Sequence, residues 1–187
     1  MEMKGEETVP LSQDKAWEAL NDPDVLGACI PGCESMEQVG DDEFKATVRT
    51  AVGPVNARFK GRVKLSDVKP PESYKMSFKG DGSAGFAQGS ATMRLAPAAS
   101  GDGTTISYDA EAKVGGKLAQ IGSRLVDGAA RKMADEFFTN LTTHMGGTPQ
   151  QAEPASQEPA QAQPQPQEKQ GLIARIMAAI ARLFGSR

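Results

Sequence analysis

Residues 55–65 read VNARFKGRVKL, and this stretch decides the fold class. Apolar or small side chains stand at every second position from Val55 to Leu65, with polar or charged ones between them. Successive side chains of a β-strand point to opposite faces, so this period of two predicts a strand with one dry face and one wet face. Such a strand is typical of an antiparallel sheet whose dry face is covered by another element.

Similar alternation recurs on both sides of this stretch. A short first strand is followed by two short helices, one capped by Ser12 and ending at Asn21, the next beginning at Asp22-Pro23. Clusters of Gly, Pro and Asp separate the later strands, and the whole pattern predicts about seven strands. The other strand segments are 4–9, 44–52, 74–79, 86–96 and 103–113.

The dry face requires a cover, and a helical pattern of about 30 residues, 117–145, supplies it. Apolar side chains recur there at steps of three and four from Leu118 to Leu141, and Gly146-Gly147 ends the pattern. The predicted fold is therefore α+β: a curved antiparallel sheet wrapped round one long C-terminal helix. This domain is expected to span residues 1–147.

Four longer motifs resemble those of a known family. They are DPDVLGACIPGCES (22–35), VGPVNARFKG (52–61), GDGSAGFAQGSATMRL (80–95) and GGKLAQIGSRL (115–125). Together they resemble the carbon monoxide dehydrogenase G-subunit family of the START and Bet v 1-like helix-grip superfamily, over nearly all of residues 1–146. The resemblance implies a non-enzymatic accessory protein of a molybdenum-containing hydroxylase of the carbon monoxide dehydrogenase type, with an apolar cavity between sheet and helix.

The inner face of the predicted sheet and helix supplies the candidate ligand-binding residues. They are Phe59, Phe78, Phe86, Met93, Tyr108, Leu118, Ile121 and Leu125. A solid core is the alternative, but small residues among the large ones (Ala57, Gly61, Gly80 and Ala110) and the family resemblance favour a cavity. An apolar pocket with few polar groups suits a lipid-like molecule such as a quinone, and Tyr108 can donate one hydrogen bond to a carbonyl.

The same face offers no catalytic constellation. It has no carboxylate pair, Ser–His pair or metal cluster, so we predict that the chain is not an enzyme and has neither catalytic nor metal-binding residues. Cys29 and Cys33 are predicted to be reduced thiols. Residues Gly80 to Gly85 match GxGxxG, but the segment after them alternates like a strand, which favours a glycine-rich hairpin over a dinucleotide site.

Charge divides the chain into three segments. Residues 1–147 have a net charge of −4, residues 148–170 of −2 and residues 171–187 of +3. The acidic balance argues against a nucleic-acid-binding protein, which needs a basic face. Residues 148–170 are rich in Pro and Gln, and this composition predicts a disordered linker.

Residues 171–187 read GLIARIMAAIARLFGSR, which predicts a basic amphipathic helix. Such a helix is typical of an interfacial membrane anchor; docking on a partner enzyme or on the domain itself is the alternative. The candidate membrane-binding residues are Leu172, Ile173, Arg175, Ile176, Ile180, Arg182, Leu183 and Phe184. Because the N-terminal residues lack an apolar secretory region, the expected location is cytoplasmic, peripheral on the inner face of the cell membrane.

These predictions combine into one functional hypothesis. The domain holds a hydrophobic ligand, with a membrane quinone as the leading candidate and no covalent cofactor, while the tail contacts anionic lipids. The linker lets the domain alternate between the bilayer and the molybdenum hydroxylase, which tethers or couples the enzyme to the membrane. Two alternatives are an assembly factor acting on the enzyme through surface contacts without a ligand, and a lyase or cyclase of the same superfamily.

Overall fold

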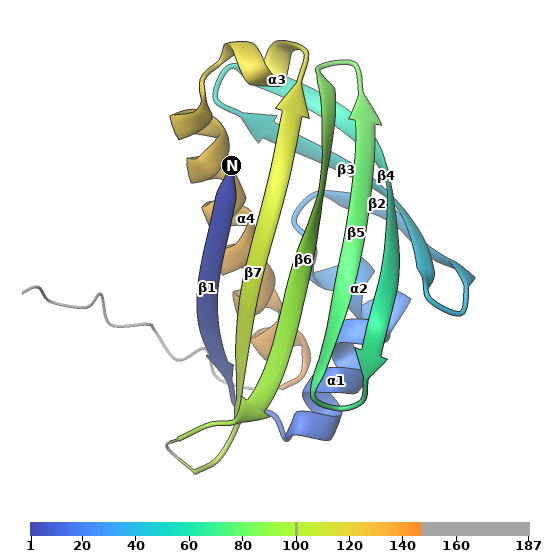
Figure 1. Ribbon diagram of the computed structural model, residues 1–187, viewed down its shortest axis with the longest axis vertical. Coiled ribbons are helices and arrows are strands. Elements are labelled where there is room, and N and C mark those ends of the chain that lie inside the picture. Colours follow the sequence, from blue (N-terminus) through green and yellow to red (C-terminus); the bar gives the residue numbers. More distant parts are fainter. Residues whose placement is uncertain (100, 147–187) are drawn as a thin grey trace, which may run out of the picture. The chain divides into compact units, whose positions relative to one another are not determined.

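The sheet predicted by the alternation is present and has seven antiparallel strands (Figure 1). The computed structural model describes residues 1–99 and 101–146, and the predicted linker (148–170) and tail helix (171–187) lie outside the described residues. The elements are β1 (Glu2–Val9), α1 (Gln13–Asn21), α2 (Pro23–Cys29), β2 (Cys33–Gly40), β3 (Glu43–Val52), β4 (Val55–Lys69), β5 (Ser73–Gly82), β6 (Gly85–Pro97), β7 (Thr104–Gly115), α3 (Lys117–Gln120) and α4 (Ser123–His144).

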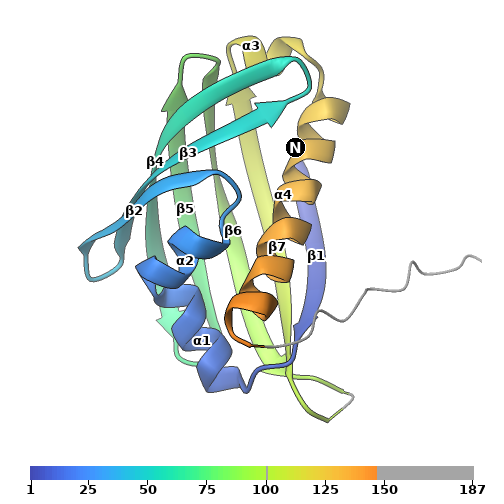
Figure 2. The same cartoon turned by 180° about the vertical axis from the view of Figure 1, so that it is seen from behind.

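The strands follow the order β1-β7-β6-β5-β4-β3-β2 across the sheet. Each connection after β2 is a hairpin, whereas α1 and α2 take the chain from β1 at one edge to β2 at the other. Figure 2 shows α1, α2 and α4 on the same face of the curved sheet. The predicted fold class, α+β with a curved antiparallel sheet and a C-terminal helix, is confirmed.

Strand β2 has no counterpart among the predicted segments. Six of its eight residues are exposed, and only Cys33 and Met36 are half-buried. It also pairs irregularly with β3, with register shifts near both of its ends. An edge strand that buries so little lacks the alternating apolar pattern by which the other strands are found.

The long helix predicted over residues 117–145 is in fact two helices. α3 ends at Gln120, and Gly122 adopts a φ of 91°, a left-handed conformation that favours glycine, before α4 begins at Ser123. This break changes the phase of the apolar stripe, so that Val126 is buried while Leu125 is 48% exposed. The expectation that Leu125 lines the interior is therefore wrong, because it extended one helical period across the break.

Two hydrophobic clusters fasten the helices to the inner face of the sheet. The first joins α1, α2 and the C-terminal part of α4 to one end of the sheet, and each large side chain fully buried there contributes about 1.5–3 kcal/mol. Its buried members are Val9, Leu11, Ala16, Ala19, Leu20, Cys29, Phe44, Leu65, Tyr74, Met93, Leu95, Ile106, Phe138 and Leu141. The second cluster lies around α3 and the start of α4, with buried members Val52, Ala57, Ala84, Leu118 and Val126.

The two short helices begin in different ways. The Asp22 carboxylate accepts hydrogen bonds from the backbone N–H groups of Asp24 (2.8 Å) and Val25 (3.3 Å), just ahead of the proline in the first turn of α2. Ser12 stands at the N-cap of α1, as predicted, but its side chain accepts no capping hydrogen bond. Only the second helix therefore has a side-chain cap at its start.

We predict that Asp22→Ala lowers the free energy of unfolding by about 1 kcal/mol, because two backbone N–H groups lose their acceptor. Ser12→Ala is the matched control at the other N-cap and should have a much smaller effect, since it removes no hydrogen bond. Urea unfolding followed by circular dichroism measures both variants. Equal losses of stability would contradict this assignment of the caps.

Candidate functional site

Small residues form a continuous row across the middle of the sheet's inner face. Ala46 lies opposite Gly61, Gly61 opposite Gly80, and Gly80 opposite Ala87, so the row crosses β3, β4, β5 and β6. A Cβ atom placed on Gly61 or Gly80 would have no described side chain within 4 Å, only backbone atoms of neighbouring strands. The row is therefore the floor of a space into which these two strands project no side chain.

Helix α4 crosses the inner side of the curved sheet between its two flanks. Its backbone lies near α2, β1 and β3, and its C-terminal part packs on the central strands through Phe138 and Leu141. The Thr50 hydroxyl donates to the Met133 sulfur at 3.8 Å, which joins α4 to β3. Around the floor, Val48, Phe78, Ala110 and Met133 are only half-buried. Half-buried apolar side chains on a face covered by a helix mean that the face is not filled to the density of a protein core.

Six of the eight candidate ligand-binding residues lie on the inner side. Phe59, Leu118 and Ile121 belong to the second cluster, and Met93 is buried in the first. Phe78 packs with neither cluster and stands two residues from Gly80 on the same strand. The structure thus places Phe78 beside the floor, whereas the four cluster members form the walls at its two ends.

Phe86 is the second misplaced candidate. It is 38% exposed on the outer face of β6, opposite Gly115 of β7, where an added Cβ atom would overlap its ring. Side chains alternate along a strand, so the inward position of Met93 puts the odd-numbered residues of β6 inside and Phe86 outside. The expectation that Phe86 faces the interior is therefore wrong, and the small Ala87 takes the inward position.

Tyr108, the sixth inward candidate, lies between β1 and α4. Its ring stacks on Phe138 with a centroid distance of 5.9 Å and an interplanar angle of 15°. On the other side it lies over Gly5, where any Cβ atom would overlap the phenol. Glycine at this position of β1 thus makes room for the ring at the inner face.

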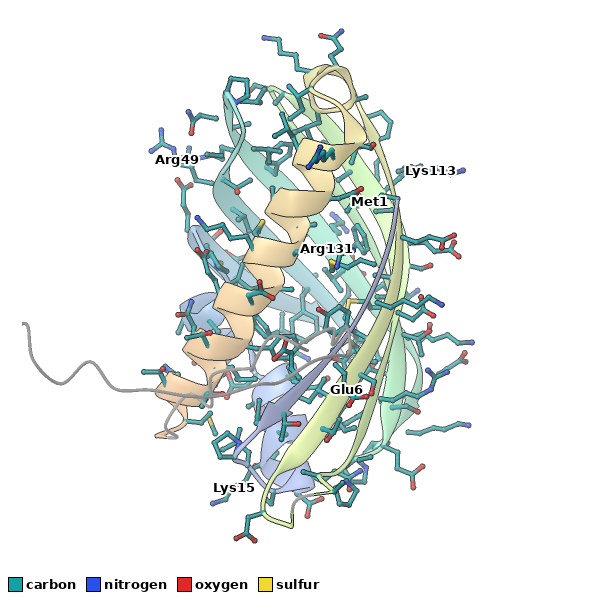
Figure 3. The ribbon with its side chains drawn as sticks, turned by 90° about the vertical axis from the view of Figure 1, so that its left-hand side faces the viewer. Met1, Glu6, Lys15, Arg49, Lys113 and Arg131 are labelled. Carbon is teal, nitrogen blue, oxygen red and sulfur yellow. The ribbon has the colours of Figure 1, made fainter. Side chains whose placement is uncertain are left out.

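Several charged residues that the sequence analysis missed surround Tyr108. Glu7 projects inward from β1, and Figure 3 shows Arg131 extending from α4 toward β1. Burial and then the Glu7 and Asp135 carboxylates raise the pKa of Tyr108, while Arg131 acts in the opposite sense. Burial, with a smaller effect of Asp135, also raises the pKa of Glu7. The sequence signal is the acid at an inward position between Gly5 and Val9.

A groove of about 710 Å³ opens where β1 begins, beside the start of α4. Met1, Val114 and Val126 form much of its apolar surface. Asp127 contributes a carboxylate whose Oδ1 is buried without a hydrogen-bond partner among the residues described. This groove borders the second cluster, and Gln88, Lys113 and Ser123 add further polar groups to its lining.

The remaining candidate motifs have structural roles. Within residues 1–99 and 101–146, no group of three His, Cys, Asp or Glu could hold a metal ion. Burial raises the pKa of both Cys29 and Cys33, which favours the unreactive thiol form.

Gly80 to Gly85 form the β5–β6 hairpin, and a strand rather than a helix follows them. None of the helices described is long and apolar enough to cross a membrane.

The geometry agrees with the comparison to protein families. Residues 5–146 match the CoxG family model, which describes the G subunit of carbon monoxide dehydrogenase. The chain belongs to this family. The match covers the whole sheet from Gly5 onward together with both C-terminal helices, and so includes the floor and the residues around Tyr108.

Solved structures share the fold of this CoxG-family chain. A conserved protein from Geobacillus kaustophilus is 30% identical, with a TM-score of 0.73, covering 78% of this chain and 95% of its own. A START superfamily protein from Mycobacterium smegmatis is 10% identical (TM-score 0.58), covering 76% of this chain and 95% of its own, which shows a common fold alone. No curated protein matches the chain.

We predict that Glu7→Gln raises the melting temperature at neutral pH, because it removes a carboxylate whose ionisation the fold disfavours. A carboxyl with a raised folded-state pKa contributes its full stability below the ordinary pKa of 4.5 and loses it as the pH rises through the folded-state pKa. The gain from the substitution should therefore vanish below pH 4.5.

Glu6→Gln, on the outer face of the same strand, is the matched control for that variant and should show no such pH-dependent gain. Calorimetry on both sides of pH 4.5 measures the effect. An equal gain at both pH values would mean that Glu7 acts through packing and not through its charge.

Proposed function

We propose that the chain is a non-enzymatic accessory protein of a molybdenum-containing hydroxylase of the carbon monoxide dehydrogenase type, and that its domain binds a hydrophobic ligand. Membership of the CoxG family supports the accessory role. The observation that supports ligand binding is the row of small residues on the inner face, where a Cβ atom added at Gly61 or Gly80 would meet no described side chain within 4 Å. An apolar, partly enclosed space with few polar groups suits a lipid-like molecule.

A membrane quinone fits the distribution of polar and apolar groups in this domain. Its isoprenoid tail would lie along the floor, in contact with Phe78 and Met133. Its carbonyl oxygens would accept hydrogen bonds at the gap between β1 and α4, where Tyr108 and Arg131 are the donors. The Tyr108 phenol, like an ordinary tyrosine, is protonated and able to donate at neutral pH, and burial raises its pKa further above the usual 10.0.

In this proposal the protein binds and positions the ligand and does not transform it. The inner face of the described sheet offers hydrogen-bond donors and apolar surface, with no nucleophile paired to a base and no metal-ligand cluster. The redox chemistry of a quinone belongs to the quinone and to the partner enzyme. The domain's contribution is to shield the apolar molecule from water during transfer.

The C-terminal segment 171–187 completes the proposal at the inner face of the membrane. Its apolar arc and its three arginines suit reversible binding to anionic lipids, each arginine adding on the order of 1 kcal/mol. The Pro- and Gln-rich residues 148–170 would let the domain reach both the bilayer and the enzyme. The chain would thereby couple the enzyme to the membrane.

We predict that purified full-length protein yields an apolar molecule on organic extraction, and that Gly61→Val/Gly80→Val abolishes this. A Cβ atom at either position meets only ordinary van der Waals contacts, and valine suits a strand, so we expect the fold to persist while the methyl groups fill the space. Mass spectrometry of the extract identifies the molecule. The control Ser77→Val, on the outer face of β5, should retain it.

Two results would contradict ligand binding. One is wild-type protein that yields nothing and whose melting temperature does not change with added quinone. The other is a filled variant that still yields the molecule. If the filled variant also retains its affinity for the enzyme, the assembly role without a ligand becomes the better explanation.

We predict that deleting residues 171–187 abolishes co-sedimentation with vesicles that contain phosphatidylglycerol. The matched variant Ile176→Gln/Ile180→Gln, which keeps the net charge but breaks the apolar arc, should reduce it strongly, because charge alone gives weak binding. Vesicles of neutral phosphatidylcholine measure the electrostatic part. Undiminished pelleting of the deleted chain would contradict the anchor.

A further inference from the structure

The outer face of the sheet has a strong charge asymmetry. Strands β3, β4 and β5 together contain nine Lys or Arg and three Asp or Glu, although residues 1–147 as a whole are acidic. Strands β1 and β7, at the other flank, contain five Asp or Glu and two Lys, and all of these except Glu7 stand at outward positions. One flank of the outer face is thus basic and the other acidic.

The basic flank places like charges directly opposite one another. Lys45 lies opposite Arg62, and Arg62 lies opposite Lys79, so three cations form a row straight across β3, β4 and β5. Arg49 lies opposite Arg58 on the same face, beyond the row formed by Thr47 and Lys60. Like charges directly opposite in a sheet are destabilising, and acids offset part of this repulsion, for example Glu37 opposite Lys45. Cations opposite cations therefore do not stabilise the sheet by themselves.

Some cations of the outer face form ion pairs with acidic side chains, and others form none among the described residues. Arg62 pairs with Glu43 at 2.8 Å and Arg58 with Glu34 at 2.7 Å. The exposed side chains of Lys45, Lys60 and Lys64 form no ion pair or hydrogen bond within residues 1–99 and 101–146. Lys60 and Lys64 flank Arg62 on the same face of β4. We use the name basic row for these two lysines together with Lys45, Arg62 and Lys79.

The surface at the basic row is hollow. A depression of about 500 Å³ contains four cations, Lys45, Lys60, Arg62 and Lys79, and two acids. A second depression of about 730 Å³ shares Arg62 and Lys79 and reaches β1 and β7, where Glu2 and Glu111 make its charge mixed. The first depression is therefore the cationic one. A concave, cationic surface is complementary to protruding carboxylates and less so to a flat layer of lipid headgroups.

We propose that the basic row is the docking surface for an acidic, protruding surface of the partner enzyme, an inference that rests on the partner named in the proposed function. Two acids, Glu37 and Asp81, lie among the four cations of the first depression, as in a polar protein interface and unlike a lipid-binding face. No large apolar side chain lines this depression within the part of the chain that the structure describes. It therefore offers no apolar group that would insert into a bilayer.

Docking of this kind is fast and sensitive to salt. Complementary charge raises the rate of association, and contacts without an apolar anchor release readily. The acidic flank formed by β1 and β7 would be repelled by the same acidic partner surface. The asymmetry of the outer face would thus orient the domain on the enzyme.

The test compares two variants of the full chain that lose the same charge. Lys45→Gln/Lys60→Gln/Lys64→Gln removes the available cations of the basic row, and Lys15→Gln/Arg94→Gln/Lys132→Gln removes three that line neither depression. Binding to the purified carbon monoxide dehydrogenase-type enzyme is measured at about 50 mM and about 300 mM salt. We expect the first variant to bind about tenfold more weakly at low salt, with a shallower salt dependence, and the second to bind as wild type.

The first variant should melt close to the wild-type temperature, because it relieves the repulsion between Lys45 and Arg62 but also removes the lysines opposite Glu37, Asp81 and Glu43. A large fall in the melting temperature would show that the cations serve the fold and would overturn the proposal. Wild-type protein that does not bind the enzyme refutes the partner itself, whereas binding that is equal in both variants refutes only the docking surface. Loss of binding to phosphatidylglycerol vesicles with unchanged enzyme binding would assign the basic row to lipid and overturn the proposal.

Discussion

Two glycines at the centre of the sheet determine how the rest of the domain is arranged. Gly61 and Gly80 lie opposite each other, and a Cβ atom at either would meet no described side chain within 4 Å, so these two strands leave room on the inner face there. Glycine within a strand costs about 0.5–1 kcal/mol relative to alanine, and an unfilled space adds lost packing. The clusters at the two ends must therefore supply the cohesion that the centre lacks. This explains why α4 is fastened at its ends and at the flanks of the sheet.

Most strands and the faces of their residues can be predicted from the local alternation of apolar and polar residues in the sequence. The alternation of 55–65 predicts the face of every residue in the first part of β4, and the burial of Ala57 and Leu65 agrees with it. Errors arise where one residue interrupts a period. Gly122 turns the chain through a positive φ, which moves Leu125 out of the buried stripe. Phe86 follows a hairpin that restarts the alternation, and the register with Gly115 places it on the outer face.

The polar features could not be predicted, because they depend on distant segments meeting. Glu7 and Asp135 are far apart in sequence and come together only when α4 crosses the edge formed by β1. The row of Lys45, Arg62 and Lys79 exists because of a register that joins three strands. Each lysine or arginine alone is an ordinary residue on the wet side of a strand. Only the pairing reveals that like charges lie opposite one another and that the outer face is divided.

The floor and the basic row are two sides of the same short stretches of chain. In Lys60-Gly61-Arg62 the glycine faces inward and both cations outward, and in Lys79-Gly80 the same alternation holds. Because neighbours on a strand point to opposite faces, a change at 60, 62 or 79 alters the outer charge without adding volume to the inner space. A change at 61 or 80 does the reverse. One layer of backbone thus separates a surface suited to an acidic protein from a space suited to an apolar molecule, and each can vary without disturbing the other.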